Sequence, residues 1–252
     1  MAKQHWKAGN MLYPVPAVMV SCQRKGEKPN IITVAWAGTV CSDPAMVSIS
    51  IRPERYSYGI IHETGEFVIN LVTEALCESA DYCGVASGRD VDKFEKTGLT
   101  AESGNRISAP GISESPVNIE CLVKQEISLG SHVMFLAEVV GVNVDESFLN
   151  DKGSLLLNDV GLVSYSHGTY FLLGKKLGTF GYSVRKKNTS GKTTNQKQSS
   201  KRTSKPKKAG TGAFRQTDVP KPPASKTKKM SDGSVTNRKI KQHGKPSPKS
   251  GR

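Results

Sequence analysis

Long apolar runs are missing from this 252-residue chain. None approaches the about 20 residues that a membrane-spanning helix requires, so we predict no transmembrane segment. The opening residues, MAKQHWKAGNMLYPVP, also lack the apolar region of a signal peptide. We therefore expect the protein to be cytoplasmic.

Cysteine and histidine are scarce and scattered. The five cysteines include no Cys-x-x-Cys pair, which argues against a zinc site and favours free thiols in a reducing compartment. The five histidines are too few and too dispersed for a metal cage, although His132 and His167 stay open as functional residues. Cys41 could act as a nucleophile, but no histidine and asparagine set supports that role, so an inert thiol is favoured.

Signature motifs of several large enzyme classes are also absent. The chain has no Gly-x-Gly-x-x-Gly after a strand, no phosphate-loop motif, no Gly-x-Ser-x-Gly and no His-Glu-x-x-His. These absences argue against dinucleotide-binding folds, phosphate-loop enzymes, serine hydrolases and zinc peptidases.

Positive charge is concentrated in the last quarter of the chain. Residues 187–252 contain 19 Lys and Arg but only 2 Asp and Glu, whereas residues 1–186 contain 17 and 20. We predict one folded domain over 1–186 and a disordered tail over 187–252, because the tail has too few apolar residues to form a core. Such a tail would attract nucleic acid or other polyanions, unless it is only a solubilising extension.

The folded part is expected to be mainly β, with short helices. Apolar, β-branched runs predict strands, which are Val15–Cys22, Ile31–Ala37, Met46–Ile51, Phe67–Leu71, Asn118–Leu129, Val133–Asp145 and Thr169–Leu173. The stretches SYGIIHETG and EALCESADYCG predict two short helices, the first with a glycine stop. Because strands and helices do not alternate regularly, we expect a closed antiparallel barrel.

Short hydroxyl side chains gather near the bends of NIITVAWAGTVCSDPAMVSISI, residues 30–51. We read residues 38–45, with Thr39, Cys41, Ser42 and Asp43, as a turn between two strands, and such short polar side chains suit a bound phosphate. The following IRPERYSYGII adds Arg52, Arg55 and Ser57 at a helix start, where backbone amides favour an anion. The alternative is structural, with Ser57 as a helix cap and Arg52 as an ordinary surface residue.

Several segments occur in an order that resembles a known family. These are YPVPAVMVSC, residues 30–71, SGRDVDKF, GSHVMFLAEVVGV and YFLLGKKLGTFGYS. Together, from about Met11 to Ser183, they resemble the flavin reductase-like family, in its flavoredoxin-type branch. The resemblance implies an FMN-binding split β-barrel that forms a homodimer with FMN near the subunit interface.

The resemblance also implies which residues bind the cofactor. They are Asn30, Thr33, Ala35, Trp36, Cys41, Ser42, Ser48, Ile49, Ser50, Arg52, Ser57, Tyr58 and Lys93. Family members commonly have Gly-Asp-His where this chain has Gly130-Ser131-His132. His132 is therefore the expected catalytic residue, but the missing aspartate leaves its orientation open.

The activity that the resemblance implies is an NAD(P)H-dependent oxidoreductase. NAD(P)H would pass a hydride to the flavin, and the electrons would go on to a small-molecule or protein acceptor. A second possibility is an electron carrier that a protein partner reduces. A third is a dimeric scaffold whose basic tail binds nucleic acid.

Overall fold

The computed structural model describes residues 1–185, and the fold is mainly β with a few short helices. The predicted disordered tail, 187–252, lies outside these residues, and the domain boundary at 186 stays a prediction. The strands are β1 Val15–Pro16, β2 Val18–Cys22, β3 Asn30–Val34, β4 Ala37–Ser42, β5 Ala45–Ile51, β6 Glu66–Leu71, β7 Ala101–Glu102, β8 Gly111–Ile112, β9 Val117–Ser128, β10 Val133–Val144, β11 Val163–Ser166 and β12 Thr169–Leu172. The helices are α1 Tyr56–Thr64, α2 Cys77–Val85 and α3 Lys93–Thr97, with short 3-10 turns at Glu74–Leu76, Glu146–Phe148 and Leu157–Asp159.

Seven antiparallel strands form the central sheet, in the order β3-β2-β6-β9-β10-β5-β4. The sheet curls, because side chains from β3 near one edge and β5 near the other enter the same apolar core. Register shifts between β9 and β10 and between β4 and β5 add local twist, which favours this curl. Phe67, Phe135 and Ile49 are fully buried at its centre.

The predicted strand 31–37 is in fact parts of two strands, and these lie at opposite edges of the sheet. The predicted strand 31–37 ends at Val34, and β4 begins at Ala37 on the opposite edge. The chain bends at Ala35 and Trp36, and the backbone N–H of Ser50 donates to the Trp36 carbonyl at 2.8 Å. The stretch predicted as a turn is therefore mostly strand β4, and the actual turn lies at Asp43-Pro44. The sequence did not indicate β4, because this exposed edge strand consists of small residues and buries little apolar surface.

Helix α1 matches its predicted position and its glycine stop. It ends at Gly65, which adopts the left-handed conformation with φ 67° and donates its N–H to the Ile61 carbonyl. The residue before the helix is Arg55, and no side chain caps the first turn. The alternative that Ser57 caps the helix is therefore wrong, since Ser57 lies inside the first turn and is buried.

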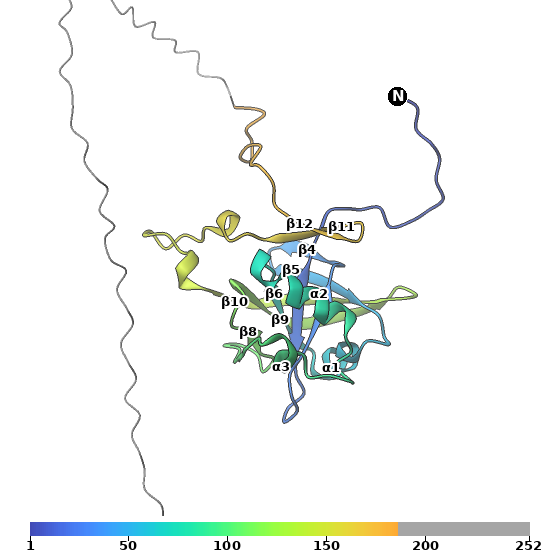
Figure 1. Cartoon of the computed structure of the whole chain (residues 1–252), viewed down its shortest axis with the longest axis vertical. Helices are drawn as coiled ribbons and strands as arrows, with labels where there is room; N and C mark the ends of the chain where they lie inside the picture. The colour runs from blue at the N-terminus through green and yellow to red at the C-terminus, as the bar shows by residue number, and fades with distance from the viewer. Residues whose placement is uncertain (186–252) are drawn as a thin grey trace, which may run out of the picture. The chain divides into compact units, whose positions relative to one another are not determined.

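A second layer covers the outer face of the sheet. Helices α2 and α3, with residues of β2, β3 and β11, share an apolar cluster that includes Met19, Ile31 and Phe94. Strands β1, β11 and β12 form a separate small sheet, which lies across one end of the main sheet (Figure 1). The first expected strand is thus divided at Ala17 between two sheets. Among residues 1–185, no helix has the length and apolar character to cross a membrane.

Candidate ligand-binding cleft

A cleft follows β3 and the bend at Ala35–Trp36, and it consists of three adjoining hollows. We call them the cationic, central and aromatic hollows, with volumes of about 610, 240 and 370 Å³. The first two share Ile32, Arg52 and Arg55. The last two share Thr33, Ala35 and Trp36. One elongated ligand could therefore contact neighbouring hollows.

Three arginines line the cationic hollow, which lies between β3, the start of α1 and the loop after α2. Arg52 and Arg55 come from the β5–α1 connection, and Arg89 comes from the loop 86–92. Among the described residues, none of the three forms an ion pair with a carboxylate. Arg89 donates to the Glu54 carbonyl at 2.8 Å, and its guanidinium lies 5.7 Å from the Tyr56 ring centre. The remaining guanidinium N–H groups suit an anion with several oxygens.

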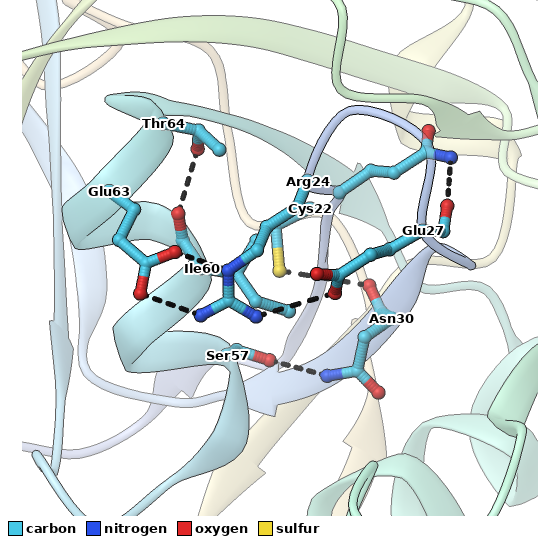
Figure 2. A network of polar contacts seen from close by, with 9 residues as sticks. Cys22, Arg24, Glu27, Asn30, Ser57, Ile60, Glu63 and Thr64 are labelled. Atoms are coloured by element: carbon cyan, nitrogen blue, oxygen red, sulfur yellow. Dashed lines mark hydrogen bonds and ion pairs between the residues drawn. The ribbon is translucent and has the colours of Figure 1, made fainter. Parts of the chain in front are cut away.

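The start of α1 adds backbone donors to the same hollow. A nine-residue helix concentrates partial positive charge at its N-terminus, and here no side chain satisfies the first turn. Buried Ser57 in this turn accepts a 2.7 Å hydrogen bond from Nδ2 of Asn30, the first residue of β3 (Figure 2). This bond joins the helix to the sheet at the floor of the hollow and fixes where the N-terminus points.

Gly88 sets how closely the loop after α2 approaches the sheet. A Cβ atom at this position would lie 2.1 Å from Oδ1 of Asn30 and 2.7 Å from the Tyr56 ring. Both contacts are shorter than any real carbon contact, so only glycine lets the loop close over the hollow. The neighbouring Arg89 depends on this approach for its position.

Lys93 is a buried cation beneath the cationic hollow. The residue is only 3 % exposed, and its Nζ donates to the carbonyls of Ile31 and Cys83 at 2.7 and 2.8 Å. Burial lowers the pKa of Lys93, and the positive Arg55 lowers it further. The ammonium therefore joins α3 to β3 and to α2, while also lining the hollow from below.

The central hollow contains the one histidine that the sequence selects as catalytic. His132 follows the β9–β10 turn, and it lies beside Arg52, Ser50 and the bend at Trp36. Its Nδ1 is 2.9 Å from the hydroxyl of Ser131, the residue that replaces the family aspartate. Burial and then Arg52 lower the pKa of His132 below its ordinary value, which favours the neutral ring. Its orientation depends on a hydroxyl and not on a carboxylate.

The aromatic hollow is formed where the bend at Trp36 meets α2 and the β11–β12 hairpin. Trp36, Tyr165 and Tyr170 contribute rings, and Val85 and Asp81 of α2 complete the wall. The Tyr165 and Tyr170 rings meet edge to face with centres 5.4 Å apart. Tyr170 donates its hydroxyl to Asp81 at 3.1 Å. Burial first, and then the Asp81 carboxylate, raises the pKa of Tyr170 to about 12.

The comparisons with known proteins agree with this architecture. The pattern described as "Flavin reductase like domain" matches residues 10–168. The chain belongs to the flavin reductase-like family. Flavoredoxin of Desulfovibrio vulgaris (Miyazaki F) is 34% identical, with a TM-score of 0.68, over 73% of this chain and all of that one.

Two further proteins are similar to the chain at lower identity. A putative flavin reductase with a split barrel domain, from Shewanella frigidimarina, is 25% identical with a TM-score of 0.61, over 67% of this chain and 86% of that one. An uncharacterized protein of Archaeoglobus fulgidus is 32% identical over half of this chain and 71% of its own length. The split-barrel fold predicted from the sequence is thus confirmed.

Eight of the predicted site residues of this flavin reductase-like chain lie in the cleft. They are Asn30, Thr33, Ala35, Trp36, Ser50, Arg52, Ser57 and Lys93, and predicted His132 joins them. Whether they hold a cofactor stays a prediction, but residues from β3, β5, α1 and α3 do converge there. The alternative that Arg52 is an ordinary surface residue is not favoured, because it lines two of the three hollows.

Five predicted residues line none of the three hollows: Cys41, Ser42, Ser48, Ile49 and Tyr58. Cys41 and Ser42 end the edge strand β4 instead of lying in a turn, and the Cys41 thiol approaches the Asp43 carbonyl at 3.4 Å. Ile49 is fully buried in the barrel core. The Tyr58 ring packs on Phe135, with centres 5.7 Å apart.

The sequence did not indicate the loop after α2, or Tyr165 and Tyr170 of the aromatic hollow, as parts of the cleft. Arg89 and Gly88 lie in SGRDVDKF, so the glycine–arginine pair after a short helix was an available signal. Tyr165 and Tyr170 carry no such signal, because they line the same hollow as Trp36 from a segment about 130 residues away. His167 lies at the exposed tip of the β11–β12 turn, where its ring meets Tyr13 edge-on. Among the described residues, no group of acidic, cysteine or histidine side chains is arranged to hold a metal.

Proposed function

We propose that the cleft binds FMN, with its phosphate in the cationic hollow and its ring system toward the central hollow. The observation that carries this proposal is the convergence of Arg52, Arg55 and Arg89 on an uncapped helix N-terminus. Such a set of donors is typical of phosphate sites. Membership of the flavin reductase-like family and the likeness to a flavoredoxin support the same ligand.

The residues present fit this cofactor in shape as well as in charge. Gly88 leaves room beside Asn30 that any Cβ would fill, and the Asn30–Ser57 pair would offer hydroxyl and amide groups to the ribityl chain. Ala35 is small, so a flat ring could approach the backbone at the bend beside Trp36. His132 lies next to Arg52, where together they could donate hydrogen bonds to an electron-rich ring.

The bound flavin would supply the redox chemistry, accepting a hydride from NAD(P)H and releasing electrons to an acceptor. The chain's own task is to hold donor and cofactor rings roughly 3–3.5 Å apart and to exclude water from between them. No side-chain nucleophile is needed. Burial raises the pKa of Cys22 and Cys121 to about 12 and that of Cys83 to about 11, which keeps these thiols protonated. We further propose a homodimer, as the family resemblance implies.

An anaerobic absorbance spectrum tests this function. The FMN-loaded protein should show the flavin band at roughly 450 nm, and NADH or NADPH should bleach it within seconds. Failure to bind any flavin would overturn the proposal. Arg106→Ala, which removes an exposed arginine outside the cleft, should bind flavin as the wild type does.

A second candidate is an electron carrier reduced by a protein partner. The 34% identity to a flavoredoxin over that protein's full length favours it. In this case the flavin binds but neither nicotinamide nucleotide bleaches it. Truncation after Ser183 tests whether the basic segment has a separate function. If it does, polyanion binding should vanish while flavin binding stays.

A further inference from the structure

The aromatic hollow is not required by the phosphate or by the ribityl chain of a flavin. It adjoins the central hollow through Thr33, Ala35 and Trp36, but its other walls come from α2 and from the β11–β12 hairpin. Its volume of about 370 Å³ is in the range of small-molecule sites. A separate planar group could therefore lie beside the flavin.

The aromatic side chains that line this hollow favour a planar ligand. Trp36, Tyr165 and Tyr170 are each half-buried, so each ring keeps a surface on which a planar ligand can stack. The edge-to-face contact of Tyr165 with Tyr170 holds the two rings in different planes. A flat heteroaromatic group fits such walls better than a flexible chain does.

Charge at the hollow distinguishes it from the rest of the cleft. Its lining contains no lysine or arginine, and its one ionisable acid is Asp81. Among the described residues, Asp81 forms no ion pair, and its Oδ1 accepts only the Tyr170 hydroxyl. A carboxylate beside aromatic faces favours a ligand that carries positive charge or N–H donors.

We propose that the aromatic hollow binds a planar heteroaromatic ring that is cationic or bears amino groups, and that this ring belongs to an electron acceptor of the flavin. The binding site stands on the geometry of the hollow alone, whereas its assignment to an acceptor rests on the proposed FMN function. Asp81 disfavours anionic planar acceptors at this hollow, although the opposite end of the cleft attracts anions.

Two planar tricyclic dyes of opposite charge test the proposal. Methylene blue is a cation and resorufin is an anion, and the fluorescence anisotropy of each reports binding to the full-length protein directly. Methylene blue should bind at least tenfold more tightly than resorufin. Addition of FMN should not displace methylene blue, because the two ligands occupy different hollows.

Substitutions on the exposed surface of α2 locate the site without threatening the fold. Asp81→Asn should raise the methylene blue Kd about fivefold, as expected for loss of one partly exposed charge. Glu78→Gln removes the same charge from an exposed position of the same helix outside the hollow, so it should leave the Kd unchanged. Val85→Lys, at a position that is 77% exposed, should weaken methylene blue at least tenfold and strengthen resorufin.

Each outcome decides the question. Equal effects of Asp81→Asn and Glu78→Gln on the methylene blue Kd would overturn the site. Complete displacement of methylene blue by FMN would show that the flavin itself fills the hollow, which also overturns it. If methylene blue binds as expected but FMN does not, the binding site stands, and the proposed function and the acceptor assignment fail together.

Discussion

The two ends of the cleft are neighbours in space but opposite in chemistry. The cationic hollow presents three arginines and a helix N-terminus, whereas the aromatic hollow presents rings and the carboxylate of Asp81. Both use β3 as a floor, so the sheet does not cause the difference. The elements that cover the sheet cause it: the start of α1 and the loop after α2 at one end, and α2 with the β11–β12 hairpin at the other. One strand can therefore serve two ligand groups of different charge.

The largest expected effect comes from removing the charge at the cationic end. Arg52→Ala combined with Arg55→Ala should weaken FMN about 100-fold, or about 2.7 kcal/mol, because two charge-assisted bonds to phosphate are lost. Riboflavin, which has no phosphate, should lose much less affinity than FMN in this variant. Quenching of flavin fluorescence on titration measures both affinities. An equal loss of riboflavin affinity would show that the arginines do not contact phosphate.

Lys93→Met should destabilise the fold under the same hollow. It leaves the buried carbonyls of Ile31 and Cys83 without their donor, at a cost of about 2 kcal/mol in the free energy of unfolding. Urea denaturation followed by circular dichroism measures this. Lys96→Met, on the exposed face of the same helix α3, is the matched control and should change little. Equal stability of the two variants would contradict a structural role for Lys93.

Glu120 offers a contrast to Asp81, because the carboxylate of Glu120 is fully buried whereas that of Asp81 is exposed. Burial alone would raise its pKa, but N–H donors of Asn105, Arg106 and Asn143 hold the pKa below its ordinary value. A depressed pKa stabilises the fold at neutral pH, and this stability is lost as pH falls below about 4.3, the ordinary value for glutamate, and through the folded value.

Glu120→Gln should therefore lower the free energy of unfolding at pH 7 by about 1.5 kcal/mol, because one N–H donor would then face the amide NH₂. The difference from wild type should shrink on acidification to about pH 3. Urea titrations at a series of pH values measure both effects. Glu102→Gln, at an exposed position of β7, is the control. A difference that does not depend on pH would argue that Glu120 is protonated in the fold.

The smallest expected effect comes from removing an exposed ion pair. Arg24 reaches Glu63 of α1 and also Glu27, and all three are solvent-accessible (Figure 2). Exposed ion pairs contribute little to stability because water and salt screen them. Glu63→Gln should therefore leave the urea midpoint nearly unchanged, in contrast to Lys93→Met. A large shift would show that Arg24 holds α1 in place.

Predictions from the sequence were accurate where a pattern was local. Strands β9 and β10 and helix α1, with its stop at Gly65, follow from apolar runs and one glycine. The bend at Ala35–Trp36 could not be predicted in this way, because it depends on β3 and β4 lying at opposite edges of one sheet. The same crossing moved Cys41 and Ser42 from the expected turn into the edge strand β4.

The sequence by itself determined that a mainly β domain precedes a strongly basic segment, and that Arg52, Arg55 and Ser57 come at the start of a helix. These features depend on composition and on contacts within a few residues. Only the tertiary structure decided that Arg89 joins Arg52, that Lys93 is buried beneath them, and that Trp36 lines one hollow with Tyr165 and Tyr170. Those contacts join segments distant in the chain, and the curl of the sheet, which no local pattern encodes, brings them together.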